Sequence, residues 1–251
     1  MTTKTRPAAG TPIWLDLMTP GAELVRPFYE ALLGWRFEKQ GSENGEYRVA
    51  FVGSRAVAAI VPPFEGQSLW LLYFASDDVQ ADAERIRELG GQVRMAPLQV
   101  GEHGALLMAT DPTGALFGLW QAGKQQGLGL TGTPGTFVWA ELQTRSADRA
   151  RDFYTALLNS TSQKVPGMNA YTLYHGHDQN VGVMQMDERH WPPELPSHWM
   201  IYFAVKNTDQ AVQAAQAGGG RLLSPPHDSP HGKITVLQDP GRATFSVIQL
   251  P

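Results

Sequence analysis

The sequence contains no cysteine and no long apolar run. Without cysteine the chain has no disulfide, no catalytic thiolate and no cysteine-bound metal, so its fold depends on packing alone. No segment reaches the roughly 18 apolar residues that a membrane-spanning helix needs. The segment Met1–Gly10 also lacks the apolar core of a secretory signal. We therefore expect a cytoplasmic protein with a disordered tail over residues 1–10 and no membrane partner.

Positive charge is also scarce. The chain has 20 Lys and Arg against 24 Asp and Glu, a formal net charge of -4 and a pI near 6.0. Binding to a phosphate backbone needs a clustered excess of basic residues. We therefore expect no nucleic-acid partner.

What the sequence does contain is an internal repeat. Trp14–Leu33 (WLDLMTPGAELVRPFYEALL) aligns with Trp139–Leu158 (WAELQTRSADRARDFYTALL) at an offset of 125 residues, with half of the twenty positions identical. The match continues at Leu69–Ala75 (LWLLYFA) over His198–Ala204 (HWMIYFA). A repeat of this length predicts two copies of one structural unit.

The repeat sets the predicted domain boundaries. Both copies close on a similar segment, HGALLMATDPTGALFGLWQ in the first and HGKITVLQDPGRATFSVIQ in the second. Between them lies a glycine-rich stretch with little apolar periodicity, which is typical of a linker. We therefore expect a first domain over residues 11–121, a linker over 122–135 and a second domain over 136–251.

Each copy shows the same order of elements. Alternating apolar residues over Ile13–Met18 predict a half-buried strand, and apolar pairs every four residues over Leu24–Leu33 predict an amphipathic helix that ends at Gly34. Strands are expected next at Tyr47–Val52 and Ala56–Val61. A second strand, helix and three further strands follow, so each copy holds two strand–helix–strand–strand–strand modules. This pattern predicts the α+β class.

The motifs resemble the vicinal oxygen chelate superfamily of glyoxalases, bleomycin-resistance proteins and extradiol dioxygenases. The resemblance rests on the helix end FYEALLG or FYTALLN, the helix that stops at Gly-Gly and the closing DPxGAxF strand. WLDL, HWMIYFAV and FSVIQ are similar to a two-domain glyoxalase-like subgroup. The resemblance implies tandem glyoxalase-like domains, whose four βαβββ modules form curled, cup-shaped mixed sheets with helices on the outside.

Metal-dependent members of this superfamily bind a divalent ion through His and Glu side chains that face the cup. Carried over to this sequence, the four ligand positions hold side chains that are unsuited to a metal: Trp14 and Trp139, Ala59 and Val183, Leu71 and Met200, Gly118 and Ser246. An indole offers only an N–H donor, so Trp cannot replace a ligand. We therefore expect no metal and no cofactor.

Residues that could carry chemistry follow from strand parity. If Trp14 faces the cup, Asp16 and Met18 face it as well, and Glu141 and Gln143 take these places in the second copy. A carboxylate buried beside an indole is a candidate general acid or base. The alternative is that Asp16 and Glu141 only accept hydrogen bonds from a neighbouring strand.

The second copy has two further candidates. His198 and Tyr202 lie two residues before and after Met200, so all three side chains should point to the same face of the strand. His198 and Tyr202 could exchange protons with a ligand. The equivalent residues of the first copy are Leu69 and Tyr73. The alternative is that His198 simply bonds to a nearby loop. His175 and His177 are expected to lie in a solvated turn.

Aromatic side chains suggest what the cups would bind. Trp14 and Trp139 are expected to line them, whereas Trp70 and Trp199 should pack toward helices. Such walls suit flat or apolar ligands, although large side chains could equally plug an empty cup. The predicted ligand-binding residues are Trp14, Met18, Tyr73, Trp139, Gln143, Met200 and Ser246.

Several functions stay open at this point. The leading hypothesis is a metal-independent protein, monomeric or homodimeric, that binds a planar or apolar organic molecule. The alternative is a metal-independent isomerase, epimerase, lyase or hydroxylase-like enzyme that uses Asp16 or Glu141 with His198 or Tyr202. A metal-dependent dioxygenase or glyoxalase requires different ligand positions, and a protein that regulates a partner would have vestigial cups.

Overall fold

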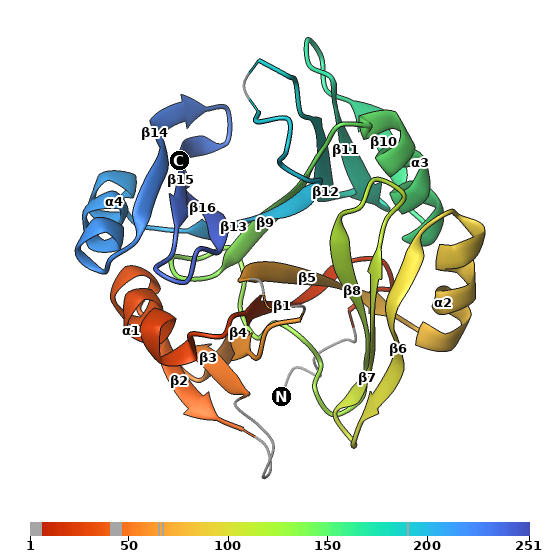
Figure 1. Cartoon of the computed structure of the whole chain (residues 1–251), viewed down its shortest axis with the longest axis horizontal. Helices are drawn as coiled ribbons and strands as arrows, with labels where there is room; N and C mark the ends of the chain where they lie inside the picture. The colour runs from red at the N-terminus through yellow and green to blue at the C-terminus, as the bar shows by residue number, and fades with distance from the viewer. Residues whose placement is uncertain (1–6, 41–46, 65, 67, 190) are drawn as a thin grey trace. The chain divides into compact units, whose positions relative to one another are not determined.

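The computed structural model describes residues 7–40, 47–64, 66, 68–189 and 191–251. These residues form two mixed sheets of eight strands with four helices (Figure 1). Each sheet contains two strand–helix–strand–strand–strand modules, so the predicted α+β class and the predicted order of modules are confirmed. Within the described part of the chain, no helix is long and apolar enough to cross a membrane.

The modules follow one another along the chain in the predicted order. The first copy consists of β1 Pro12–Met18, α1 Ala22–Leu33, β2 Arg36–Lys39, β3 Arg48–Val52, β4 Arg55–Val61, β5 Leu69–Ser76, α2 Val79–Glu88, β6 Gln92–Val100, β7 Gly104–Thr110 and β8 Leu116–Ala122. The second copy consists of β9 Phe137–Thr144, α3 Ala147–Leu157, β10 Thr161–Lys164, β11 Ala170–His175, β12 Asp178–Gln185, β13 His198–Ala204, α4 Thr208–Ala217, β14 Arg221–Ser229, β15 Gly232–Gln238 and β16 Thr244–Gln249. The strand orders are β2-β3-β4-β1-β5-β8-β7-β6 and β10-β11-β12-β9-β13-β16-β15-β14.

Two details differ from the expectations. Strand β2 was not located from the sequence, because it is a four-residue edge strand whose mostly exposed side chains (RFEK) show no apolar alternation. Strand β1 was predicted to be half-buried, but every residue from Ile13 to Met18 is buried. Successive side chains of a strand point to opposite faces of the sheet, so both faces of β1 are covered.

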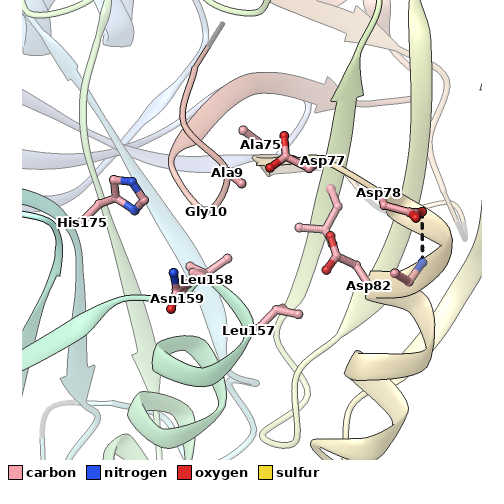
Figure 2. A pocket seen from close by; sticks show the side chains of 12 residues that line it. Ala9, Gly10, Ala75, Asp77, Asp78, Asp82, Leu157, Leu158, Asn159 and His175 are labelled. Atoms are coloured by element: carbon pink, nitrogen blue, oxygen red, sulfur yellow. Dashed lines mark hydrogen bonds between the residues drawn. The ribbon is translucent and has the colours of Figure 1, made fainter.

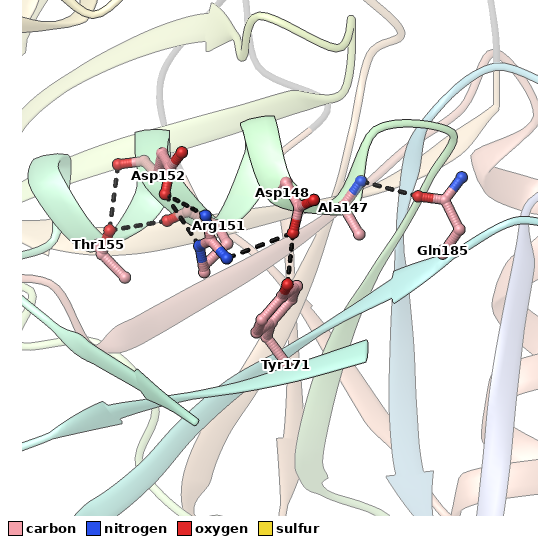
Figure 3. Close-up of polar contacts among 7 residues, drawn as sticks. All are labelled: Ala147, Asp148, Arg151, Asp152, Thr155, Tyr171 and Gln185. Atoms are coloured by element: carbon pink, nitrogen blue, oxygen red, sulfur yellow. Dashed lines mark hydrogen bonds and ion pairs between the residues drawn. The ribbon is translucent and has the colours of Figure 1, made fainter. Parts of the chain in front are cut away.

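Glutamine side chains bind the starts of three helices. The first N–H groups of a helix have no partner inside the helix. A closing strand supplies one by placing a side-chain oxygen at the helix start: Gln121 Oε1 accepts from Val79 N at 3.1 Å, Gln185 from Ala147 N at 3.0 Å and Gln249 from Thr208 N at 3.2 Å. Figure 3 shows the contact of Gln185. Each of these strands is thereby fixed to the helix of its own module.

A polar cluster on α3 fixes this helix to strand β11 (Figure 3). Asp148 accepts hydrogen bonds from the Tyr171 hydroxyl and from Arg151, at 3.3 Å for the latter. The Arg151 guanidinium also lies 4.7 Å from the centre of the Tyr171 ring, within the range of a cation–π contact. The cluster therefore holds the helix on its sheet from the solvent side.

The chain divides into two compact units that do not coincide with the two copies. The first unit contains the described residues of Met1–Trp14, Leu72–Gly127 and Ala140–Trp199. The second contains Leu15–Leu71, Leu128–Trp139 and Met200–Pro251. Each unit therefore combines one module from each copy. Accordingly, α2 lies beside α3 in the first unit and α1 beside α4 in the second (Figure 1).

The repeated motifs meet inside these units. In the second unit the Phe28 ring packs against Gly220, where a Cβ would lie 2.6 Å from a ring carbon. In the first unit the Phe153 ring packs against Gly91, where a Cβ would lie 3.1 Å away. Gly91 and Gly220 are therefore crowded from two sides, by the Phe ring of the opposite copy and by a backbone carbonyl of their own copy, Thr110 O at 2.8 Å and Gln238 O at 2.7 Å from the Cβ position.

A buried hydrogen-bonded chain joins the same motifs in the second unit. Tyr29 Oη donates to Asp239 Oδ2 at 2.8 Å and accepts from Trp70 Nε1 at 3.0 Å. Burial raises the pKa of Asp239, although the Tyr29 hydroxyl opposes the rise, and burial together with the Asp239 charge raises the pKa of Tyr29. The prediction that Trp70 packs toward a helix is confirmed.

The first unit contains the matching residues with one difference. Trp199 Nε1 donates to Tyr154 Oη at 3.1 Å, as predicted from the face of the strand on which it lies. Burial, followed by the charge of Asp111, raises the pKa of the Tyr154 phenol. However, the Tyr154 hydroxyl is close enough to Asp111 to affect its charge but not aligned for a hydrogen bond, so Asp111 Oδ2 lacks a well-aligned donor among the described residues. The two units therefore contain equivalent residues, but the hydrogen bond between the tyrosine and the aspartate is well formed only in the second unit.

We expect Tyr29→Phe to destabilise the protein more than Tyr154→Phe does. Loss of the Tyr29 hydroxyl leaves both Trp70 Nε1 and Asp239 Oδ2 buried without a partner. Each orphaned group costs about 1–3 kcal/mol of folding free energy. Loss of the Tyr154 hydroxyl orphans chiefly one indole N–H. Urea denaturation of the two variants measures the difference, and equal losses would show that Asp239 gains nothing from Tyr29.

Candidate functional site

The predicted site residues are distributed over both units. The first unit contains Trp14, Tyr73, Glu141, Gln143 and His198. The second unit contains Asp16, Met18, Trp139, Met200, Tyr202 and Ser246. Most of these side chains are buried, and Glu141, Trp139, His198 and Tyr202 are half-buried. The two predicted carboxylates, Asp16 and Glu141, thus belong to different units, and the role of each as an acid or base stays a prediction.

Glu141 and Gln143 are brought together on strand β9. Gln143 Nε2 donates to Glu141 Oε1 at 2.5 Å. Gln143 is 4% exposed, and its Oε1 has no hydrogen-bond partner among the described residues. The predicted site therefore contains an amide whose NH₂ group is hydrogen-bonded and whose oxygen, Gln143 Oε1, can still accept a hydrogen bond.

The last ligand position differs between the copies. In the first unit Tyr73 pairs with Gly118, and a Cβ on Gly118 would lie 2.2 Å from a ring carbon of Tyr73. In the second unit Tyr202 pairs with Ser246, a fully buried residue whose Oγ has no partner among the described residues. The Tyr73 ring therefore takes the space of a side chain at 118, whereas position 246 keeps a small polar group.

The strand register also tests the second ligand position. Asp16 pairs with Ala59 and Glu141 pairs with Gly182. Gly182, rather than Val183, is therefore the counterpart of Ala59, because Val183 pairs with Leu142 and points to the opposite face of the sheet. Neither Ala59 nor Gly182 has a side-chain donor atom.

These positions do not fit the metal of the metal-dependent superfamily members. Such a site needs imidazole or carboxylate donors. At the positions of this chain that correspond to the family's metal ligands, the side chains are indole, aliphatic, thioether or hydroxyl groups, or there is no side chain. Over the part of the chain that the structure describes, no group of three or more His, Cys, Asp and Glu side chains is arranged to hold a metal ion.

His198 lies at the start of β13, close to the segment that precedes it. Its Nδ1 is 2.9 Å from the Pro196 carbonyl oxygen, and its ring centre is 6.1 Å from that of Trp191. Because a carbonyl can only accept, Nδ1 carries the proton and the neutral ring keeps its basic lone pair on Nε2. Burial lowers the pKa of His198 below its ordinary value, which the contact with Pro196 opposes.

The first unit also contains a pocket that the sequence analysis missed. It has a volume of about 320 Å³, and its walls include Gly10, Ala75, Asp77, Asp82, Leu158 and His175. Figure 2 shows His175 on one side and the aspartates on the other. None of the predicted site residues lines it. A contrast between the copies was the available signal, since Lys206 and Ala211 stand where the first copy has Asp77 and Asp82.

Structural contacts account for much of the pocket's polar lining. Asp78 caps α2 by accepting from Gln80 N and Ala81 N, and Asp82 accepts from Ser76 Oγ at 2.6 Å. Burial raises the pKa of Asp82. The expectation of a solvated turn is wrong for His175, whose Nδ1 is buried, and right for the exposed His177.

Replacing His198 should flatten the dependence of stability on pH. Because the folded pKa lies below the ordinary value of 6.5, the unfolded chain binds the proton more readily. Wild-type stability should therefore fall as the pH drops through about 6.5 toward the folded pKa. His198→Gln should lose this component in urea denaturation at a series of pH values, while the control His177→Gln retains it. Identical slopes in the wild type and His198→Gln would contradict the burial effect.

Curated relatives match nearly the whole chain. A Mycobacterium tuberculosis protein named "Putative glyoxylase CFP32" is 37% identical over 251 residues, which cover 96% of this chain and 95% of the relative. The anthracycline biosynthesis protein DnrV of Streptomyces peucetius is 33% identical over 263 residues, with 98% and 95% covered.

Solved structures share the fold at low identity. The 2,3-dioxygenase LapB from Pseudomonas sp. KL28 has a TM-score of 0.67 at 12% identity and covers 98% of this chain and 93% of its own. The Mn(II)-bound glyoxalase from Novosphingobium aromaticivorans has a TM-score of 0.64 at 12% identity, with 96% and 82% covered. At this identity the likeness concerns the fold alone.

The family model supplies the assignment. The model described as Glyoxalase/Bleomycin resistance protein/Dioxygenase superfamily matches residues 13–119 and 136–247, one match in each copy of the repeat. Together with the relatives, this match shows that the chain belongs to the Glyoxalase/Bleomycin resistance protein/Dioxygenase superfamily.

Proposed function

We propose that this chain binds a planar organic molecule without a metal ion at the superfamily's ligand positions. The observation that carries the proposal is the donor chemistry of those positions. Gly118 lies under the Tyr73 ring, Ser246 offers a hydroxyl, and the register partners Ala59 and Gly182 offer no donor atom. Neither copy keeps the carboxylate or imidazole set that a divalent ion requires.

Two buried oxygen atoms support binding of an organic ligand. Gln143 Oε1 and Ser246 Oγ are buried and have no partner among the described residues. Buried polar atoms in folded proteins nearly always have a partner, which can be a protein group, water or a ligand. Both residues were predicted from the sequence to contact a ligand, and they belong to different units, so a molecule bound in either unit would complete the hydrogen bonding of the residue there.

The relatives support a flat ligand. The name of DnrV associates that protein with anthracycline biosynthesis, and anthracyclines contain a planar polycyclic aromatic core. Trp14 and Trp139 at the equivalent positions of the two copies suit such a molecule, because indole rings stack on flat aromatic surfaces and bury a large apolar area.

Planar aromatic compounds should quench the tryptophan fluorescence of the protein. We expect saturable quenching by some of a panel of anthraquinones and related ring systems, because an indole in contact with a bound ring loses emission. The same titration after dialysis against EDTA should give the same affinity. Loss of binding on chelation with recovery on adding manganese, iron or zinc would contradict the proposal, as would a panel without any binder.

A second candidate is a metal-independent enzyme that acts on such a ligand. The state of His198 favours it, because the lowered pKa keeps the ring neutral near pH 7 with Nε2 as the basic nitrogen. In this reading Glu141 or Asp16 is the general base, and His198 or Tyr202 is its partner.

The enzyme reading predicts that Glu141→Gln abolishes turnover while the melting temperature stays nearly unchanged. The amide keeps the shape of the carboxylate but cannot accept a proton. Conversion of each compound that binds is followed by chromatography and mass spectrometry, with the exposed-site variant Glu188→Gln as a control. If the wild type leaves every bound compound unchanged, the protein is a binder and not an enzyme of this kind.

A further inference from the structure

We propose that Gln143 selects the ligand by accepting a hydrogen bond from a hydroxyl or N–H group on an otherwise flat molecule. The inference rests on the proposed function and specifies the ligand's class: a planar compound with a free donor, such as a phenol, rather than a carboxylic acid or an ether.

Glu141 fixes the direction of the Gln143 amide. Gln143 Nε2 donates to Glu141 Oε1 at 2.5 Å. The amide NH₂ group thus faces the carboxyl group of Glu141, which accepts the hydrogen bond. The oxygen Oε1 is the other end of the amide and does not take part in this contact.

The neighbouring strand β12 offers nothing to this oxygen. Gly182 pairs with Glu141 and Met184 pairs with Gln143, so their side chains lie on the same face of the sheet. Neither a glycine nor a thioether has an N–H or O–H donor. Gln143 itself is 4% exposed, and its Oε1 is buried without a partner among the described residues.

The fold does not require an amide at this place. Met18 occupies the equivalent position of the first copy, at the same offset of 125 residues that aligns Asp16 with Glu141. Met18 is 4% exposed, as Gln143 is. An apolar side chain thus satisfies the packing of this position, and the polar group in the second copy calls for a partner that the first copy does not need.

The chemistry of Gln143 Oε1 defines the class of ligand. A hydroxyl or N–H group of the ligand can donate to this oxygen. An ether or an ionised carboxylate has no donor and would leave Oε1 unpaired, and burying the charge of a carboxylate costs more than burying an ether. This oxygen therefore favours neutral, hydroxylated aromatic molecules.

Three matched probes test the inference: 2-hydroxyanthraquinone, 2-methoxyanthraquinone and anthraquinone-2-carboxylate. We expect the wild type to bind the hydroxyl compound about tenfold more tightly than the methyl ether, the size of one good hydrogen bond, and the carboxylate more weakly than both. Gln143→Met, which installs the residue of the first copy, should abolish the preference for the hydroxyl compound over the ether. Gln163→Met, at an exposed position of β10, should keep the preference.

The outcomes separate this inference from the proposed function. If the wild type binds the hydroxyl and ether compounds equally, or if Gln143→Met keeps the preference, the role of Gln143 is wrong while ligand binding stands. If no probe binds the wild type, the proposed function fails and the inference fails with it.

A crystal structure of the wild type with 2-hydroxyanthraquinone gives a test that needs no variant. We expect the ligand hydroxyl within hydrogen-bond distance of Gln143 Oε1. A hydroxyl bound elsewhere, or an Oε1 that accepts from a protein group or from water alone in the complex, would overturn the inference.

Discussion

The contact between the FY helix of one copy and the Gly-Gly and Asp-Pro motifs of the other is the constraint on which this structure depends. Phe28 packs on Gly220, and Tyr29 donates to Asp239. Because the partners come from different copies, a module from each is needed to bury either helix, and both compact units arise from this exchange. The motifs that identify the family in the sequence are thus largely the contacts that build the core.

Because the core is built by contacts between modules of different copies, residues at the positions of the family's metal ligands can be replaced without disturbing it. The core contacts are made by side chains on the face of the sheet that packs against the helices. The residues at the ligand positions point to the other face. Substitutions such as Gly118 under the Tyr73 ring, or Gly182 beside Glu141, therefore leave the aromatic core intact. A fold held together in this way can lose a metal site and keep its strands, so belonging to the family does not by itself supply an activity.

Most of the fold could be predicted from the sequence, because repeats and apolar periodicity determine the modules. The edge strand β2 escaped because exposed polar residues show no period. The exchange of modules also escaped, because pairing between Phe28 and Gly220 leaves no local signal. Of the site, parity placed Glu141 and Gln143 on one face, but their hydrogen bond and the pocket beside His175 depend on side-chain geometry that spacing does not encode.

Native mass spectrometry of the protein with 2-hydroxyanthraquinone tests the central claim most directly. The protein should be purified without chelators, so that any metal it acquires in the cell is retained. We predict a complex whose mass equals that of the chain plus the ligand, with no mass for a metal ion. A complex that forms only when the chain also carries a metal ion would contradict the account.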